Sequence, residues 1–161
     1  MAYRNMKNLV IENAEIKFQN FSGIEKQYNN EGERNFCVKI DDPATAQRLK
    51  EDGWNVRVYI PRDPDSKPFS YIQVKVSYQP ARLAPHIYVY NNNVATELNE
   101  DTIGLLDNAD IANVDVVIRP HEWDPGRIKA YVKEMHVTLE ESAFAHKYSR
   151  NSGYENDRLP F

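Results

Sequence analysis

Two segments near the middle of the chain place cations and aromatic rings at alternate positions, as strands with one outward face would. The outward positions of the segments WNVRVYI (54–60) and FSYIQVKVSY (69–78) are polar or aromatic: Asn55, Arg57, Tyr59, Phe69, Tyr71, Gln73 and Lys75. Such rings stack on unpaired bases, each contributing about 1–3 kcal/mol, while nearby Lys and Arg side chains hold the phosphates. The pattern therefore predicts a surface for single-stranded nucleic acid.

Three further cations and one phenylalanine extend this predicted face. Lys17, Lys39 and Arg119 join it if their strands are neighbours of the first two. Phe21, in the stretch KFQNFSG, lies where the first hairpin of a barrel opens and can clamp a base there, whereas Phe18 has inward parity and is expected in the core. Edge-strand charges and ordinary cross-strand tyrosine pairs are the alternative interpretation.

No pattern in the sequence predicts catalysis. The chain has no phosphate-cradling glycine loop and no nucleophile elbow, and its four histidines lack metal-ligand spacing. The nearest approach is HEWDPG, where His121, Glu122 and Asp124 crowd a hairpin end, but alternation puts His121 and Glu122 on opposite faces. We expect a binding protein with no catalytic residues, metal or cofactor; a hydrolase centred on His121 and Glu122 is a distant alternative.

Charge is distributed unevenly along the 161 residues, whose formal net charge is −4. Residues 54–90 carry five Lys or Arg against two Asp, whereas residues 91–118 carry six acids and no Lys or Arg. We therefore expect a basic side and an acidic side. The basic side suits phosphates, and the acidic side is the working surface in the main alternative, a protein-interaction module.

The single cysteine and the absence of long apolar runs indicate the compartment. Cys37 alone cannot form an internal disulfide framework, which suits a reducing interior. The sequence contains no apolar stretch near the roughly 20 residues that span a bilayer, and its N-terminus lacks a signal-peptide pattern. We expect a cytoplasmic protein that does not contact membranes.

Alternation with a period of two dominates the chain and predicts a mainly β fold. Strands are expected over residues 9–21, 35–40, 54–60, 69–78, 86–92, 113–123 and 127–141. One short helix is expected from an Asp42 N-cap to Gly53. A five-stranded barrel like the oligonucleotide/oligosaccharide-binding (OB) fold, with one short helix and an extra hairpin, suits this set; a β-sandwich is the alternative.

Strand parity assigns side chains to the core. In residues 54–60 it places Trp54, Val56, Val58 and Ile60 inward, and Trp123 is expected to pack at a strand end. We place the binding domain at residues 1–148 and a disordered tail at residues 149–161, where Ser, Asn, Gly and charged residues replace periodic apolar ones.

The tail ends in four residues that resemble the tip of bacterial single-stranded DNA-binding proteins, whose acidic tails end in Asp-Asp-Ile-Pro-Phe. These are Asp157, Leu159, Pro160 and Phe161, with Arg158 where that family has an aspartate. In that family the terminal Phe enters an apolar pocket on a replication or repair enzyme and its carboxylate pairs with a basic residue. The resemblance implies a partner-binding tip, and Arg158 weakens its acidity.

Residues 9–140 are similar in strand pattern to the small single-stranded DNA-binding proteins of bacteriophages. The pattern is FSGIEKQYNNEGERNFCVKI followed by a short helix and GWNVRVYIP. The resemblance implies an OB barrel that binds single-stranded DNA in phage DNA replication or recombination inside the host cytoplasm. It also implies partner enzymes at the C-terminal tip and leaves open a homo-oligomer. The alternative, a protein-interaction module, is an inhibitor or assembly factor that uses the acidic side.

Overall fold

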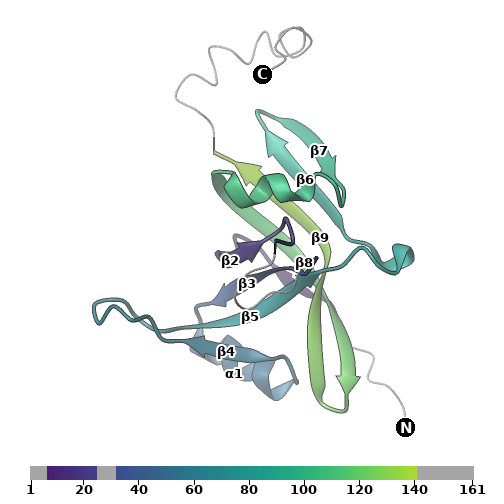
Figure 1. The fold of residues 1–161 in the computed structure, drawn as a ribbon. Helices are drawn as coiled ribbons and strands as arrows, with labels where there is room; N and C mark the ends of the chain where they lie inside the picture. Colours follow the sequence, from purple (N-terminus) through teal and green to yellow (C-terminus); the bar gives the residue numbers. More distant parts are fainter. Residues whose placement is uncertain (1–6, 25–31, 141–161) are drawn as a thin grey trace, which may run out of the picture.

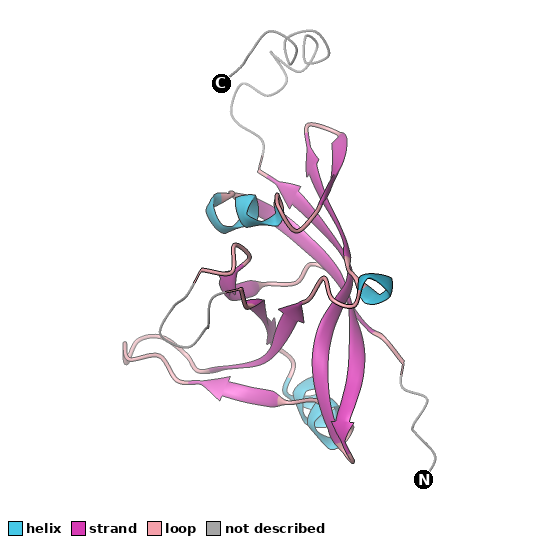
Figure 2. Ribbon diagram, turned by 45° about the vertical axis from the view of Figure 1, so that its right-hand side comes forward, coloured by secondary structure: helices cyan, strands magenta, loops and turns pink. Residues whose placement is uncertain are grey.

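The structure, a computed structural model, describes residues 7–24 and 32–140. Nine strands form one sheet: β1 (Leu9–Ile11), β2 (Ile16–Asn20), β3 (Arg34–Ile40), β4 (Val56–Tyr59), β5 (Phe69–Val76), β6 (His86–Asn91), β7 (Val94–Leu98), β8 (Ile111–Asp124) and β9 (Arg127–Leu139). The described residues also form one α-helix, α1 (Pro43–Glu51), and two 3₁₀ turns, η1 (Ala81–Leu83) and η2 (Ile103–Asn108) (Figures 1 and 2). The predicted mainly β, OB-like fold is confirmed. The proposed boundary at residue 148 and the tail lie outside the described residues.

The strands follow the order β1-β8-β9-β5-β3-β2, with β4 added to β5 and the hairpin β6–β7 added to β9. Strand β9 runs parallel to β5 and β6, and the other pairs are antiparallel. No ladder between described residues joins β1 to β2, so the sheet is not the closed five-stranded barrel that the sequence predicts. The segment between β1 and β2 nevertheless bridges the two edges: the Ala14 N–H donates to the Val114 carbonyl at 2.7 Å, and the Glu15 carbonyl accepts from Lys39 N–H at 2.9 Å.

The predicted first strand, 9–21, is divided because the backbone turns at Asn13. Asn13 has φ of 53°, a left-handed conformation that Asn tolerates better than most residues, and its N–H donates to Asp115 Oδ1 at 2.9 Å. β1 therefore pairs with β8 while β2 pairs with β3. One chain segment thus contributes to both sides of the fold.

The core lies inside the curved sheet. Alternation holds in β5, whereas in β9 the register shift opposite Val117 and Ile118 brings Val132 and Met135, three residues apart, to the same face. The fully buried residues of β3, β5, β8 and β9 have side chains on one face: Phe36, Val38, Ile72, Val74, Val116, Ile118, Val132 and Met135. Leu49 of α1 and the adjacent Trp54 cover one end, and Ile103 and Leu106 of η2 cover another.

The helix begins where the sequence predicts. The Asp42 carboxylate accepts from Ala44 N–H at 3.3 Å and from the Thr45 hydroxyl at 2.7 Å, which caps α1. Gly53 follows the helix with φ of 106°, and a Cβ there would lie 2.7 Å from the Gly126 carbonyl oxygen. The Gly53 carbonyl also accepts from Ile128 N–H at 3.0 Å. This close approach fixes the β8–β9 hairpin against the start of β4.

The prediction that Val58 and Ile60 point into the core is wrong. Their side chains are 61% and 74% exposed. β4 pairs with β5 at the edge of the sheet, and beyond Val56 its inner face leaves the region covered by the core. Period-two alternation identifies which residues share a face, but a face is buried only where another element covers it.

Candidate nucleic-acid interface

The outward residues of β3, β4 and β5 lie side by side because their strands are in register. Tyr71 on β5 stands opposite Arg57 on β4 and opposite Lys39 on β3. Tyr59 stands opposite Phe69 in the same ladder. Directly opposed residues on neighbouring strands point to the same side of a sheet. The predicted cation and aromatic positions of these strands therefore form one surface.

Four rings gather at one end of this surface. The aromatic cluster comprises Phe18, Tyr59, Phe69 and Tyr71. The ring centroid of Phe18 lies 5.0 Å from that of Tyr59 and 6.4 Å from that of Phe69. Phe18 is 53% exposed and Tyr59 37% exposed. A cluster of rings open to water is suited to stacking on bases.

The structure reverses the predicted positions of Phe18 and Phe21. Phe18 lies on the surface, while Phe21 is completely buried, with its ring centroid 5.4 Å from that of Phe36. The cause is a break in the ladder between Lys17 and Asn20, where Phe18 adopts φ of 55° and the alternation of β2 shifts. Phe21 has no surface to offer a base, and Phe18 takes the place predicted for it.

Two of the predicted cations, Lys17 and Lys39, share an acidic partner. The Glu15 carboxylate lies 3.4 Å from each ammonium nitrogen, and Lys39 also lies 3.4 Å from Asp41. Burial acts to raise the pKa of Glu15, but its hydrogen bond and charge interaction with Lys39, together with Lys17, outweigh this and lower it. The hydrogen bond to Glu15 raises the pKa of Lys39. Part of the positive charge of these lysines is therefore already compensated.

Arg119 reaches the same surface from the other direction. It pairs with Tyr131 across β8 and β9, with its guanidinium carbon 5.0 Å from the centre of the Tyr131 ring. Tyr131 in turn pairs with Lys75 on β5. Arg119, Tyr131 and Lys75 thus form a row across three strands. The expectation that the strand of Arg119 extends the face is supported by this register.

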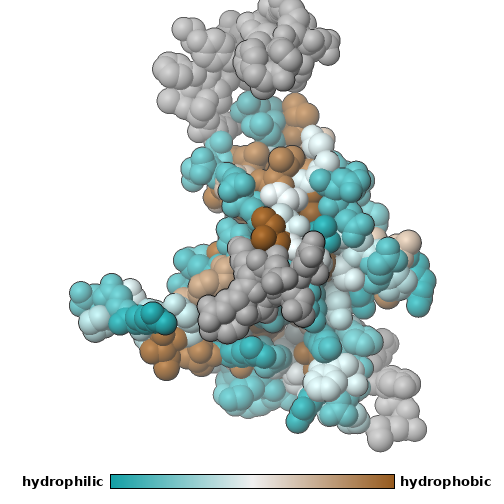
Figure 3. Space-filling view, viewed as in Figure 1, coloured by the Kyte–Doolittle hydropathy of each residue, from teal (hydrophilic) through white to brown (hydrophobic). Residues whose placement is uncertain are grey.

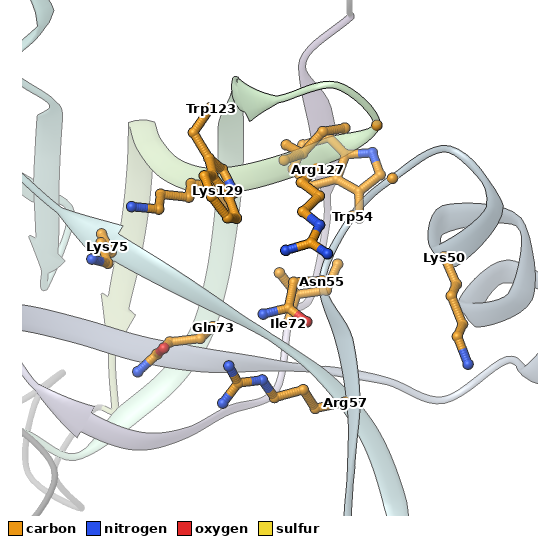
Figure 4. A pocket seen from close by; sticks show the side chains of 14 residues that line it. Lys50, Trp54, Asn55, Arg57, Ile72, Gln73, Lys75, Trp123, Arg127 and Lys129 are labelled. Atoms are coloured by element: carbon orange, nitrogen blue, oxygen red, sulfur yellow. The ribbon is translucent and has the colours of Figure 1, made fainter.

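A cationic pocket of about 540 Å³ opens between this surface and the β8–β9 hairpin. In Figure 4, Arg57, Gln73 and Lys75 lie on the β4–β5 side of it, and residues of the β8–β9 hairpin lie opposite. None of the described residues that line it is acidic, and five are basic: Lys50, Arg57, Lys75, Arg127 and Lys129. Such a concentration of positive charge suits phosphate groups.

Trp123, which the sequence suggests is packing, is a surface residue of this pocket and is 49% exposed. The Arg127 guanidinium lies 5.6 Å and the Lys129 ammonium 5.3 Å from its ring. These contacts hold an exposed ring among cations. The period-two alternation of RIKAYVK (127–133) places Arg127 and Lys129 on the parity of Tyr131 and could have indicated them. Trp54, the other tryptophan, is 7% exposed and packs in the core as predicted.

The single cysteine lies beneath the surface. Cys37 stands between Lys17 and Gln73 in the ladders of β3 and is 6% exposed. Burial raises the pKa of its thiol to about 11, although the nearby Arg57 acts to lower it. At neutral pH the thiol is therefore protonated, as expected of a packing residue and not of a nucleophile.

Much of the acidic segment lies at the far end of the molecule. β7 and η2 lie away from α1 and β4 in Figure 1. Two of its carboxylates stabilise the fold: Asp107 accepts from the backbone N–H groups of Phe21 at 2.7 Å and Ser22 at 2.9 Å, and Asp115 holds Asn13. These two side chains are therefore engaged within the fold and are less free to contact a docking partner.

The HEWDPG stretch is engaged in local contacts. Glu122 accepts from Gly126 N–H at 3.4 Å, Asp124 pairs with Arg127 at 3.8 Å, and the His121 ring meets Tyr131 edge-on at 6.1 Å. Across residues 7–24 and 32–140, no group of three or more His, Cys, Asp or Glu is placed to hold a metal ion. Within the same ranges, no helix has the length and apolar character needed to span a bilayer.

Comparison with known proteins gives a family match. Residues 1–159 match the model of a family described as "Putative phage ssDNA-binding domain", which covers nearly the whole chain. No curated protein and no solved structure matches the chain.

Proposed function

Because the chain belongs to the phage single-stranded DNA-binding domain family, we propose that it coats and protects single-stranded DNA during phage DNA replication or recombination. Binding is independent of base sequence and involves no chemical step. The observation that carries the proposal is the continuous outward surface on which Tyr71 lies between Arg57 and Lys39. Rings for bases and cations for phosphates occur together on it, as sequence-tolerant binding requires.

The aromatic cluster and the cationic pocket, the two halves of this surface, bind different parts of the DNA. The aromatic cluster stacks on bases, and the cationic pocket with its neighbour Arg119 binds the phosphates that follow. Phe69 and Lys75 are six residues apart on β5, which at about 3.3 Å per residue separates them by about 20 Å. Single-stranded DNA that contacts both halves of this surface is therefore extended over several nucleotides.

The opposed charges explain how a protein of net charge −4 can bind a polyanion. The positive charge is concentrated where the strand lies, and β7 and η2 keep part of the negative charge at the other end (Figure 1). Association is then steered by the local field, not by the net charge. High salt screens this field, so affinity falls as salt rises.

A titration with oligo-thymidine, followed by intrinsic Tyr and Trp fluorescence, tests the proposal. We expect saturable quenching at low salt and a fall in affinity at higher salt, with a log–log slope no steeper than about −4 if the five pocket cations and Arg119 release counterions. A duplex of the same length should bind more weakly, because its bases are not free to stack. No quenching and no retention at low salt would favour the protein-interaction module.

The C-terminal tip is included in the proposal on the strength of its sequence. Asp157, Leu159, Pro160 and Phe161 lie outside the described residues and resemble the partner-binding tip of bacterial single-stranded DNA-binding proteins. We propose that they recruit replication or recombination enzymes in the host cytoplasm. Pull-down of host proteins by the full chain and by Phe161→Ala tests this, with loss of specific partners in the variant as the expected result.

A further inference from the structure

Strand β4 is an edge strand with an apolar surface. Within the described residues it pairs with β5 alone. Val58 and Tyr59 of β4, and Ile60, which directly follows the strand, are 61%, 37% and 74% exposed. Figures 1 and 2 show β4 along the lower margin of the sheet, and Figure 3 shows apolar groups beside the protruding loop between β4 and β5. An uncovered apolar edge is a site where another strand pairs.

We propose that β4 pairs with β4 of a second copy of this chain, antiparallel and about a twofold axis at Val58. In that register Val58 faces its own equivalent, Val56 faces Ile60 of the other copy, and Arg57 faces Tyr59 of the other copy. The first two contacts bury apolar groups on one side of the sheet. The third forms a cation–aromatic pair on the other side.

The sequence of β4 selects this register from those that a twofold axis perpendicular to the sheet allows. An axis at Arg57 would place two guanidinium groups opposite each other, which is unfavourable. An axis at Tyr59 would place Arg57 opposite Pro61, which has no N–H for the ladder. The axis at Val58 gives favourable contacts on both faces of the sheet. Because β4 is complementary to itself in this register, a second copy fits the edge better than an unrelated strand.

The second copy completes the DNA surface, so this inference rests on the proposed function. Arg57 lines the cationic pocket and Tyr59 belongs to the aromatic cluster. Pairing places the Arg57 of one copy beside the aromatic cluster of the other, which joins two surfaces into one. Because the twofold axis reverses strand direction, the dimer holds two single-stranded segments that run in opposite directions. Pairing over about five residues is a small interface, so we expect micromolar self-association that DNA strengthens.

Disulfide trapping without DNA tests the pairing, and its result does not depend on DNA binding. Paired residues of antiparallel strands have Cα atoms about 4.5–5.5 Å apart, within the range for a disulfide. Val58→Cys should therefore form a covalent dimer under mild oxidation. Val94→Cys is the matched control, because Val94 lies on strand β7 at a similar exposure of 52%. The native Cys37 is 6% exposed and should contribute little.

Sedimentation equilibrium provides the second readout. Wild type should be partly dimeric at about 100 µM, and Val58→Lys should weaken self-association at least about tenfold. The circular dichroism of this variant should be unchanged, since Val58 is exposed. Equal trapping of Val58→Cys and Val94→Cys, or a wild type that stays monomeric with and without oligo-thymidine, would overturn the pairing. Quenching in the separate titration would still support the proposed function in either case.

Discussion

Arg57 on β4 stands directly opposite Tyr71 on β5, with both side chains on the outward face of the sheet. A cation and a ring held at this spacing can contact a phosphate and its neighbouring base at the same time. Tyr71→Ala should lower affinity for oligo-thymidine by about 5- to 150-fold, the range expected when one stacking contact of about 1–3 kcal/mol is lost. Tyr88→Ala, on β6, is the control and should bind as wild type. Equal losses in both variants would show that the Tyr71 effect is not specific to this surface.

Phe18 and Phe21 should respond oppositely to the same substitution. Phe18 is exposed in the aromatic cluster, so Phe18→Ala should weaken DNA binding with little change in the free energy of unfolding. Phe21 is completely buried, so Phe21→Ala should lower the free energy of unfolding by about 3–5 kcal/mol. Urea unfolding and fluorescence titration of both variants check this. Normal DNA binding by Phe18→Ala would remove Phe18 from the interface.

Each cation of the cationic pocket should contribute to the salt dependence of DNA binding. Removing Lys75 or Lys129 by mutation to Ala should weaken binding at low salt and reduce the magnitude of the log–log salt slope by about 0.7 per cation. Arg48→Ala is the control, because Arg48 lines the groove beside β1 and not the cationic pocket. If the control changes the slope as much as the two variants, the effect belongs to net charge and not to the pocket.

Glu15 should act against DNA binding, since it compensates Lys17 and Lys39. Glu15→Gln keeps the shape of the side chain and removes its charge, so affinity at low salt should rise a few-fold and the gain should shrink as salt rises. Because the folded-state pKa of Glu15 lies below its ordinary value of 4.5, the wild-type ion pairs persist at neutral pH and are lost as pH falls below that value. Unchanged or weaker binding by Glu15→Gln would contradict this role.

Alkaline pH should destabilise the fold through Cys37. Burial raises the pKa of this thiol from its ordinary 9.0 to about 11, so the folded state retains a proton that the unfolded chain releases. The corresponding stability is present below pH 9 and lost as pH rises toward 11. Guanidinium unfolding at pH 7 and pH 10 measures the loss, and Cys37→Ala should reduce it. Burial also raises the pKa of Tyr78 from 10.0 to about 12, so Tyr78 should cause a further loss of folding stability as pH rises toward 12.

The sequence predicts the regular parts of this molecule well because their cause is local. Alternation in β5 and the Asp42 cap of α1 depend on neighbouring residues, and the structure has both. The positions of Phe18 and Phe21 depend on a break in the β2–β3 ladder. No periodic pattern contains such a break, so parity gives the wrong face for both rings.

The cationic pocket could be predicted only in part. Arg57 and Lys75 follow from strand parity, but Trp123, Arg127 and Lys129 join them through a contact between distant segments. That contact is the approach of Gly53 to Gly126, which brings the β8–β9 hairpin over the start of β4. The pattern of residues within a single strand does not predict this approach. The exposure of Val58 and Ile60 escapes prediction for a similar reason, since it depends on which elements cover an edge.

The most direct test of the central claim is the fluorescence titration of the wild-type chain with oligo-thymidine at low salt, repeated with Tyr71→Ala and Lys75→Ala. We expect saturable quenching by the wild type, weaker binding by both variants, and recovery of the fluorescence as salt is added. Absence of quenching in the wild type, or quenching that both variants retain at full affinity, would contradict the assignment of single-stranded DNA to this surface.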